Sequence, residues 1–122
     1  MKITLLQIVY GTTSIVGLVA TWYFNLQIEE GGFANFISDL YVNSASSSIA
    51  NDLFVVVFTY LVWSSLEIKR LGMSLRLGVL WGIANAVLTL VIAAACGVPL
   101  FMLMRERRLA KLAEAQSTDN SA

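Results

Sequence analysis

Long stretches without charged residues are the feature that most limits how this chain can fold. No Asp, Glu, Lys or Arg occurs at positions 3–28, and none occurs at positions 77–104. A run of about 20 apolar residues is enough for a helix to cross the hydrocarbon core of a bilayer. A soluble domain of 122 residues could not bury this much apolar surface, because small domains have a high ratio of surface to volume. The sequence therefore predicts an integral membrane protein.

The hydropathy pattern predicts an all-α fold with three spanning helices, over about residues 3–24, 49–66 and 77–104. A cleaved signal peptide is the alternative for the first run, but that run exceeds a typical signal core of about 7–15 apolar residues. The third run is about 42 Å long if fully helical, so we expect tilt or a kink at Pro99.

The segment between the first two spans has a short amphipathic pattern. Its apolar positions follow helical spacing: Phe33, Phe36, Ile37, Leu40 and Tyr41. This pattern predicts a helix that lies in the membrane interface or packs on neighbouring protein. Residues 43–48 are interpreted as a polar loop. Residues 1–115 then form one transmembrane three-helix bundle, and residues 116–122 form a disordered polar tail.

Small residues at helical spacing indicate where the spanning helices approach one another. In lipid, close backbone contact rather than the hydrophobic effect holds helices together. The candidate packing residues are Gly78, Gly82 and Ala86 in the third run and Gly17 in the first. Asn85 lies near the middle of the third run, where we expect a buried side chain with an interhelical hydrogen bond. One of these ridges could also serve an intermolecular contact.

Composition excludes several kinds of chemistry. The chain has no histidine and one cysteine, so the commonest general base and the usual zinc-ligand sets are missing. Its net charge of zero gives no basic footprint for nucleic acid. No glycine-rich phosphate motif occurs either. We therefore expect no metal, no cofactor and no nucleic-acid partner.

Asp52 is the residue singled out as a catalytic or ion-binding candidate. An ionisable group within a span is costly and is a functional hypothesis by default. The alternative is an acid at headgroup level that stabilises the positive end of its own helix. Glu67, 15 residues later, is interpreted as part of a solvated charged turn with Lys69 and Arg70.

The basic residues do not fix the orientation. With three spans, four Lys or Arg residues lie near each side, namely Lys2, Lys69, Arg70 and Arg76 against Arg105, Arg107, Arg108 and Lys111. The first loop has no basic residue, which suits the outside. We therefore expect the amino terminus inside and the carboxyl tail outside.

Several landmarks in order resemble a family of small bacterial membrane proteins catalogued only as a domain of unknown function. They are Phe24-Asn25-Leu26-Gln27, Asn43 with the serines that follow, Asp52, Trp63, Glu67, Arg70-Leu71-Gly72-Met73, and Pro99-Leu100-Phe101 before Arg105-Glu106-Arg107. The resemblance covers about residues 20–108. It implies a multi-pass protein of the bacterial inner membrane and supplies no activity.

The favoured functional hypothesis is a non-enzymatic membrane component that acts through helix–helix contacts. Its partners would be the lipid bilayer and either copies of itself or a larger complex in which it is a small subunit. The alternatives are a lipid- or isoprenoid-handling enzyme and an oligomeric transporter, each using Asp52.

Overall fold

The structure is a computed structural model that describes residues 3–27 and 32–119. In chain order its elements are α1 (Leu5–Asn25), α2 (Gly32–Leu40), α3 (Ser44–Arg70), α4 (Leu75–Val87), the π-helix η1 (Leu88–Ile92) and α5 (Ala94–Asp119). The described residues are nearly all helical and include no strand, so the all-α fold class is confirmed for them. Three helices are long and apolar enough to cross a membrane: Leu5–Asn25, Ser44–Arg70 and Leu75–Ile92.

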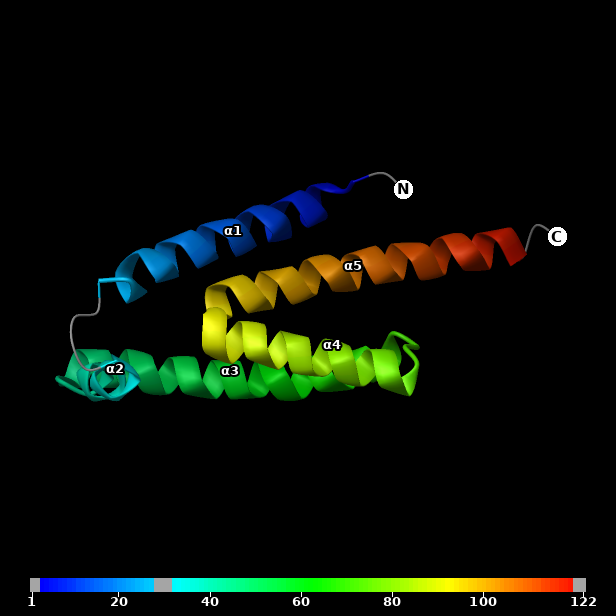
Figure 1. Ribbon diagram of the computed structural model, residues 1–122. Coiled ribbons are helices and arrows are strands. Elements are labelled where there is room, and N and C mark those ends of the chain that lie inside the picture. The colour runs from blue at the N-terminus through cyan, green and yellow to red at the C-terminus, as the bar shows by residue number, and fades with distance from the viewer. Residues whose placement is uncertain (1–2, 28–31, 120–122) are drawn as a thin grey trace.

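The third charge-free run folds as two helices rather than the single helix expected over 77–104. η1 ends at Ile92, Ala93 is extended (φ −174°, ψ 132°), and α5 then runs back beside α4 (Figure 1). Pro99, the expected kink, lies inside α5. The tight return depends on Gly97, because a Cβ there would lie only 2.8 Å from the backbone nitrogen of Thr89.

The hairpin formed by α4, η1 and α5 changes which ends of the chain lie together. The start of α1, the α3–α4 turn and the end of α5 all lie at one end of the molecule (Figure 1). That end carries all the basic residues that the structure describes: Lys69, Arg70, Arg76, Arg105, Arg107, Arg108 and Lys111. Lys2 lies outside the described residues. The expectation that the carboxyl tail and the second loop lie on opposite sides is therefore wrong.

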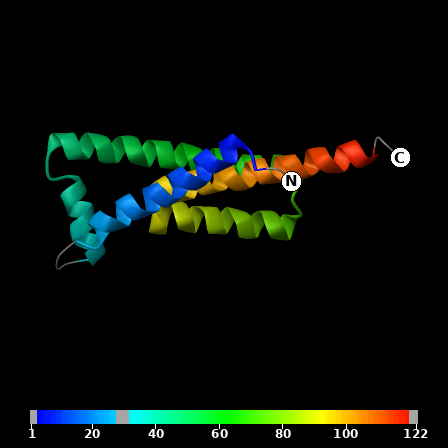
Figure 2. The ribbon, with the colours of Figure 1, turned by 90° about the horizontal axis from the view of Figure 1, so that it is seen from above.

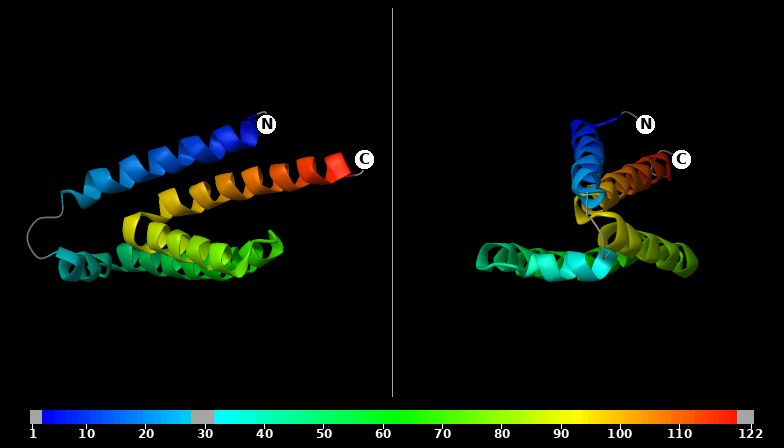
Figure 3. Two further views of the ribbon diagram at one scale, coloured as in Figure 1. Left: turned by 45° about the vertical axis from the view of Figure 1, so that its right-hand side comes forward. Right: turned by 60° about the vertical axis from the view of Figure 1, so that its left-hand side comes forward.

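The helices pack as two pairs. α1 packs mainly on α5, and α3 packs on α4, which gives two layers joined by the turn at Ala93 (Figure 3). α2 lies across the far ends of α1 and α3 (Figure 2). Large rings bridge α3 and α5, because Phe101 stacks edge-on against Tyr60 and Trp63 at centroid distances of 6.0 and 5.9 Å.

Local capping explains where α3 begins. Asn43 accepts hydrogen bonds from the backbone nitrogens of Ala45 and Ser46 through its side-chain oxygen, and Ser46 bonds back to the Asn43 nitrogen. This reciprocal capping box starts the helix at Ser44, inside the segment interpreted as a loop. At the other end of the chain, α5 continues to Asp119, past position 115, where a disordered tail was expected.

The small residues proposed for packing differ in how closely they are approached. A Cβ at Gly17 would overlap the backbone carbonyl of Ala95, so α1 and α5 meet backbone to backbone there. A Cβ at Gly78 would lie 3.2 Å from Ile68 of α3. Gly82 leaves an ordinary 3.9 Å to the same side chain, and Ala86 is half-buried.

We predict that Gly17→Ala destabilises the fold by about 1–3 kcal/mol, because the added methyl group forces α1 away from α5. Gly11→Ala on the same helix is the matched control, since its Cβ would make only a 3.8 Å contact with Leu103. Thermal unfolding in detergent measures both. Equal stability of the two variants would contradict the α1–α5 contact.

Candidate functional site

One group of buried polar side chains lies where α4 meets α3. The Tyr60 hydroxyl donates to Asn85 Oδ1 at 2.7 Å, and Asn85 Nδ2 donates to Ser64 Oγ at 2.9 Å. Asn85 is 5% exposed and Ser64 is 1% exposed. The Ser64 hydroxyl donates in turn to the Leu61 carbonyl of its own helix. Asn85 thus joins α4 to α3. Its amide forms hydrogen bonds with the hydroxyls of Tyr60 and Ser64, which would otherwise be buried among apolar groups without this partner.

A charged contact lies next to this network, toward the basic end. Glu67 is only 6% exposed, and its Oε1 accepts a hydrogen bond from Arg105 Nε at 2.7 Å. Arg105 also donates to Glu106 at 2.9 Å, while Arg70 lies 3.7 Å from the other Glu67 oxygen. The hydrogen bond to Glu67 raises the pKa of the Arg105 guanidinium above its ordinary value. The interpretation of Glu67 as a solvated turn is therefore wrong, because α5 returns and covers it.

Two hydrogen bonds from α1 hold the hairpin at its turn. Trp22 Nε1 donates to the carbonyl of Ile92 at 3.0 Å, and the Ser14 hydroxyl donates to the carbonyl of Cys96 at the same distance. Because η1 ends at Ile92, no later residue of that helix donates a backbone hydrogen bond to the Ile92 carbonyl. Within a membrane such a group needs a protein donor, and Trp22 supplies one.

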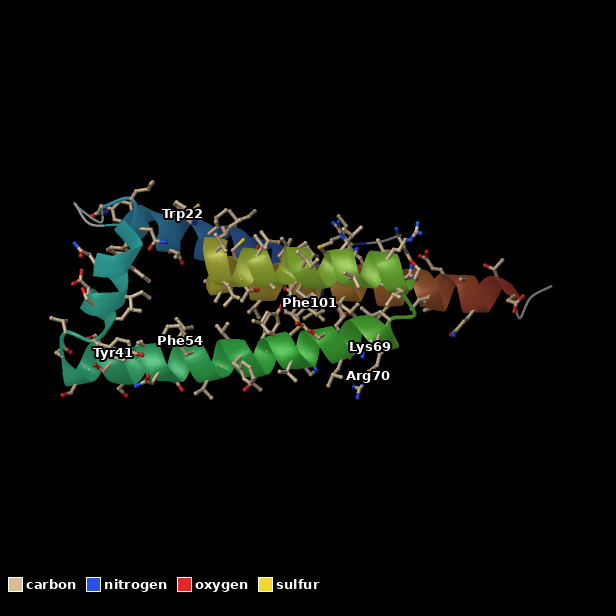
Figure 4. All side chains as sticks on the ribbon, turned by 60° about the horizontal axis from the view of Figure 1, so that its bottom comes forward. Trp22, Tyr41, Phe54, Lys69, Arg70 and Phe101 are labelled. Atoms are coloured by element: carbon tan, nitrogen blue, oxygen red, sulfur yellow. The ribbon has the colours of Figure 1, made fainter. Side chains whose placement is uncertain are left out.

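Asp52 lies far from these contacts. It is the ninth residue of α3 and is exposed, and no hydrogen bond or ion pair joins it to another residue in the described part of the chain. Its neighbour Asn51 accepts a hydrogen bond from the Tyr41 hydroxyl at 3.1 Å, which ties the end of α2 to α3 (Figure 4). A helix dipole acts mainly within the first turn. Asp52 is therefore too far along α3 to serve chiefly as a charge at its N-terminus.

The arrangement offers little for acid–base or metal chemistry. Among residues 3–27 and 32–119, no three of the His, Cys, Asp and Glu side chains converge as a metal site would require. Two of the serines that follow Asn43 bond locally at the start of α3: Ser46 and Ser47 both donate to the Asn43 carbonyl. Cys96 is buried against Ser14, with 3.3 Å between sulfur and oxygen.

Residues 9–107 match the family described as protein of unknown function DUF2834. The chain belongs to the DUF2834 family. The match spans α1 to the middle of α5, so the DUF2834 region includes the hairpin and the Glu67–Arg105 ion pair. Neither the curated proteins nor the solved structures contain a significant match to the chain.

The ion pair generates a stability prediction. Glu67→Gln leaves Arg105 without its buried partner, and we expect a loss of about 2–3 kcal/mol, below the usual range for fully buried pairs because Arg105 is 28% exposed. Removing both charges in a Glu67→Gln, Arg105→Gln double variant should cost less than the single change, since no charge is left unpaired.

Glu106→Gln is the matched control for this experiment. Glu106 also bonds Arg105, but its side chain is 27% exposed, so its loss should cost less than about 1 kcal/mol. Thermal unfolding in detergent compares these three variants with Arg105→Gln alone, so that the double-mutant cycle is complete. Strictly additive losses in the double variant would contradict a coupled α3–α5 ion pair.

Proposed function

We propose that the protein is a non-enzymatic membrane component that binds a membrane-spanning helix of a partner protein along one face of α3. The observation that carries the proposal is the environment of Asp52. This carboxylate lies on an exposed, largely apolar helix, and every basic residue that the structure describes lies at the opposite end of the molecule. A charge in that position gains most from a donor on another protein.

One exposed stripe of α3 that includes Asp52 has the spacing of a helix-packing seam. Ser48, Asp52, Val55, Thr59 and Val62 are all exposed and recur every three or four residues, and we call them the α3 face. This spacing keeps one stripe of a helix directed at a neighbouring helix. In a bilayer, serine, threonine and other polar groups on such a stripe can bond across to a partner.

The protein's own helices leave the α3 face uncovered. Between Ser48 and Thr59 only Ala50 and Val57 are buried. α1 packs on α5 instead, and α2 lies only across the end of α3 (Figure 4). The enzyme and transporter alternatives both require groups that act together with Asp52. The adjoining residue Asn51 is instead bonded to Tyr41, and this contact holds α2.

The chemistry of Asp52 indicates the kind of partner. A second copy in the same orientation would bring a like charge toward Asp52, which is unfavourable. A partner helix with a basic or hydroxyl-bearing residue at that depth would instead complement it. We therefore propose a heterologous helix as the occupant. The positive-inside tendency places the basic end of the chain in the cytoplasm, so that contact would lie in the outer half of the membrane.

A photocrosslinking amino acid at Val55 tests this proposal in intact membranes. Val55 is 65% exposed on the α3 face, and Leu80, 64% exposed on α4, is the matched control position. We expect a discrete protein adduct from position 55 only, lost in Asp52→Leu and retained in Asp52→Asn, because asparagine still forms hydrogen bonds. Lipid adducts alone at both positions would contradict the proposal. An adduct of twice the monomer mass would replace the heterologous partner by a second copy.

A further inference from the structure

Two adjoining hollows lie between α4 and α5. The first is apolar, has a volume of about 270 Å³, and runs between the two helices from Leu77 to Leu88. The second, also about 270 Å³, lies at the basic end and is lined in part by Arg107, Arg108 and Lys111. Leu77, Trp81 and Met104 line both hollows, so they form one continuous groove.

The charges in the basic hollow are not neutralised by nearby acids. Glu106, the adjacent acid, is engaged with Arg105, and no ion pair joins Arg107, Arg108 or Lys111 to an acid within the residues that the structure describes. The Arg108 Nε is buried and has no hydrogen-bond acceptor there. A buried donor without an acceptor is costly, so an anion that reached this guanidinium would supply a missing acceptor.

The dimensions of the apolar part fit a lipid chain. From Leu77 to Leu88, α4 and η1 rise by about 16 Å. One leaflet contributes roughly half of a 30 Å hydrocarbon core. An acyl chain lying along this groove would therefore extend from the basic end to about the middle of the bilayer. A soluble anion would leave this apolar length empty.

We propose that this groove binds an anionic glycerophospholipid. Its phosphate would accept hydrogen bonds from Arg107 and Arg108, with Lys111 adding a third positive charge. One acyl chain would lie between α4 and α5 against Leu80, Ala84 and Leu100. Basic pockets between membrane helices on the cytoplasmic side suit such headgroups. The site is independent of the α3 face, so either proposal can fail without the other.

The proposal predicts selective retention of anionic lipid by the purified full-length protein. Native mass spectrometry in detergent would compare phosphatidylglycerol with phosphatidylcholine. We expect the triple variant Arg107→Gln, Arg108→Gln, Lys111→Gln to weaken phosphatidylglycerol binding by about tenfold or more. The matched control changes Lys69, Arg70 and Arg76 to Gln, which removes the same charge from the same end, and it should shift binding by less than about twofold.

Two further measurements separate a lipid site from a general affinity for anions. Ala84→Phe fills the apolar hollow without altering charge, and it should also weaken phosphatidylglycerol binding. Glycerol 3-phosphate, which has the phosphate but no acyl chain, should not displace the lipid at equal concentration. Equal losses in the two triple variants, no effect of Ala84→Phe, or displacement by glycerol 3-phosphate would each overturn the proposal. Circular dichroism of each variant verifies that it has folded.

Discussion

A chain reversal at the end of a long apolar helix is the constraint on which the rest of the structure depends. Where η1 ends at Ile92 the backbone leaves its helical hydrogen bonds, and lipid offers no water to replace them. The fold meets this requirement with donors from α1, chiefly Trp22, and with glycines that let the helices meet closely. α1 therefore stabilises the hairpin, and it is also long and apolar enough to cross a membrane.

The reversal determines where the charges meet. Because α5 returns along α4, Arg105 reaches Glu67 at the end of α3, and the remaining basic residues of α5 join those of the α3–α4 turn. One end of the described molecule is consequently rich in Lys and Arg, while the α2 end carries Asp39 and Asp52 and no basic residue. This separation underlies both proposals, since it leaves Asp52 without a cation and places unneutralised arginines beside an apolar groove.

The sequence predicted the helices better than it predicted their connections. Membrane character, the helical fold class and a helix close to the observed α2 follow from hydropathy and periodicity, which depend on local side-chain pattern. The hairpin does not follow from these patterns. Ala93 is not a residue type typical of turns, and Pro99, the expected kink, does not lie at the turn. The 28-residue length of the third run was the available signal, since about 42 Å is too long for one span and suits two shorter helices.

Treating the third run as a single helix also led to wrong expectations for individual residues. Glu67 looked solvated because its partner, Arg105, was assigned to the opposite side of the membrane. The prediction for Asn85 did not depend on the topology. An amide in the middle of an apolar run needs a hydrogen-bond partner however the helices are arranged. Its actual partners, Tyr60 and Ser64, depend on helix packing that a single sequence does not contain.

The distance between positions 77 and 104 tests the hairpin most directly. Spin labels on Leu77→Cys and Met104→Cys, in a Cys96→Ser background, would be measured by pulsed electron paramagnetic resonance in lipid. The two side chains line the same groove on neighbouring helices, so the account predicts a separation below about 20 Å. One continuous helix over 77–104 would place the labels roughly 40 Å apart, and that result would contradict the reversal at Ala93.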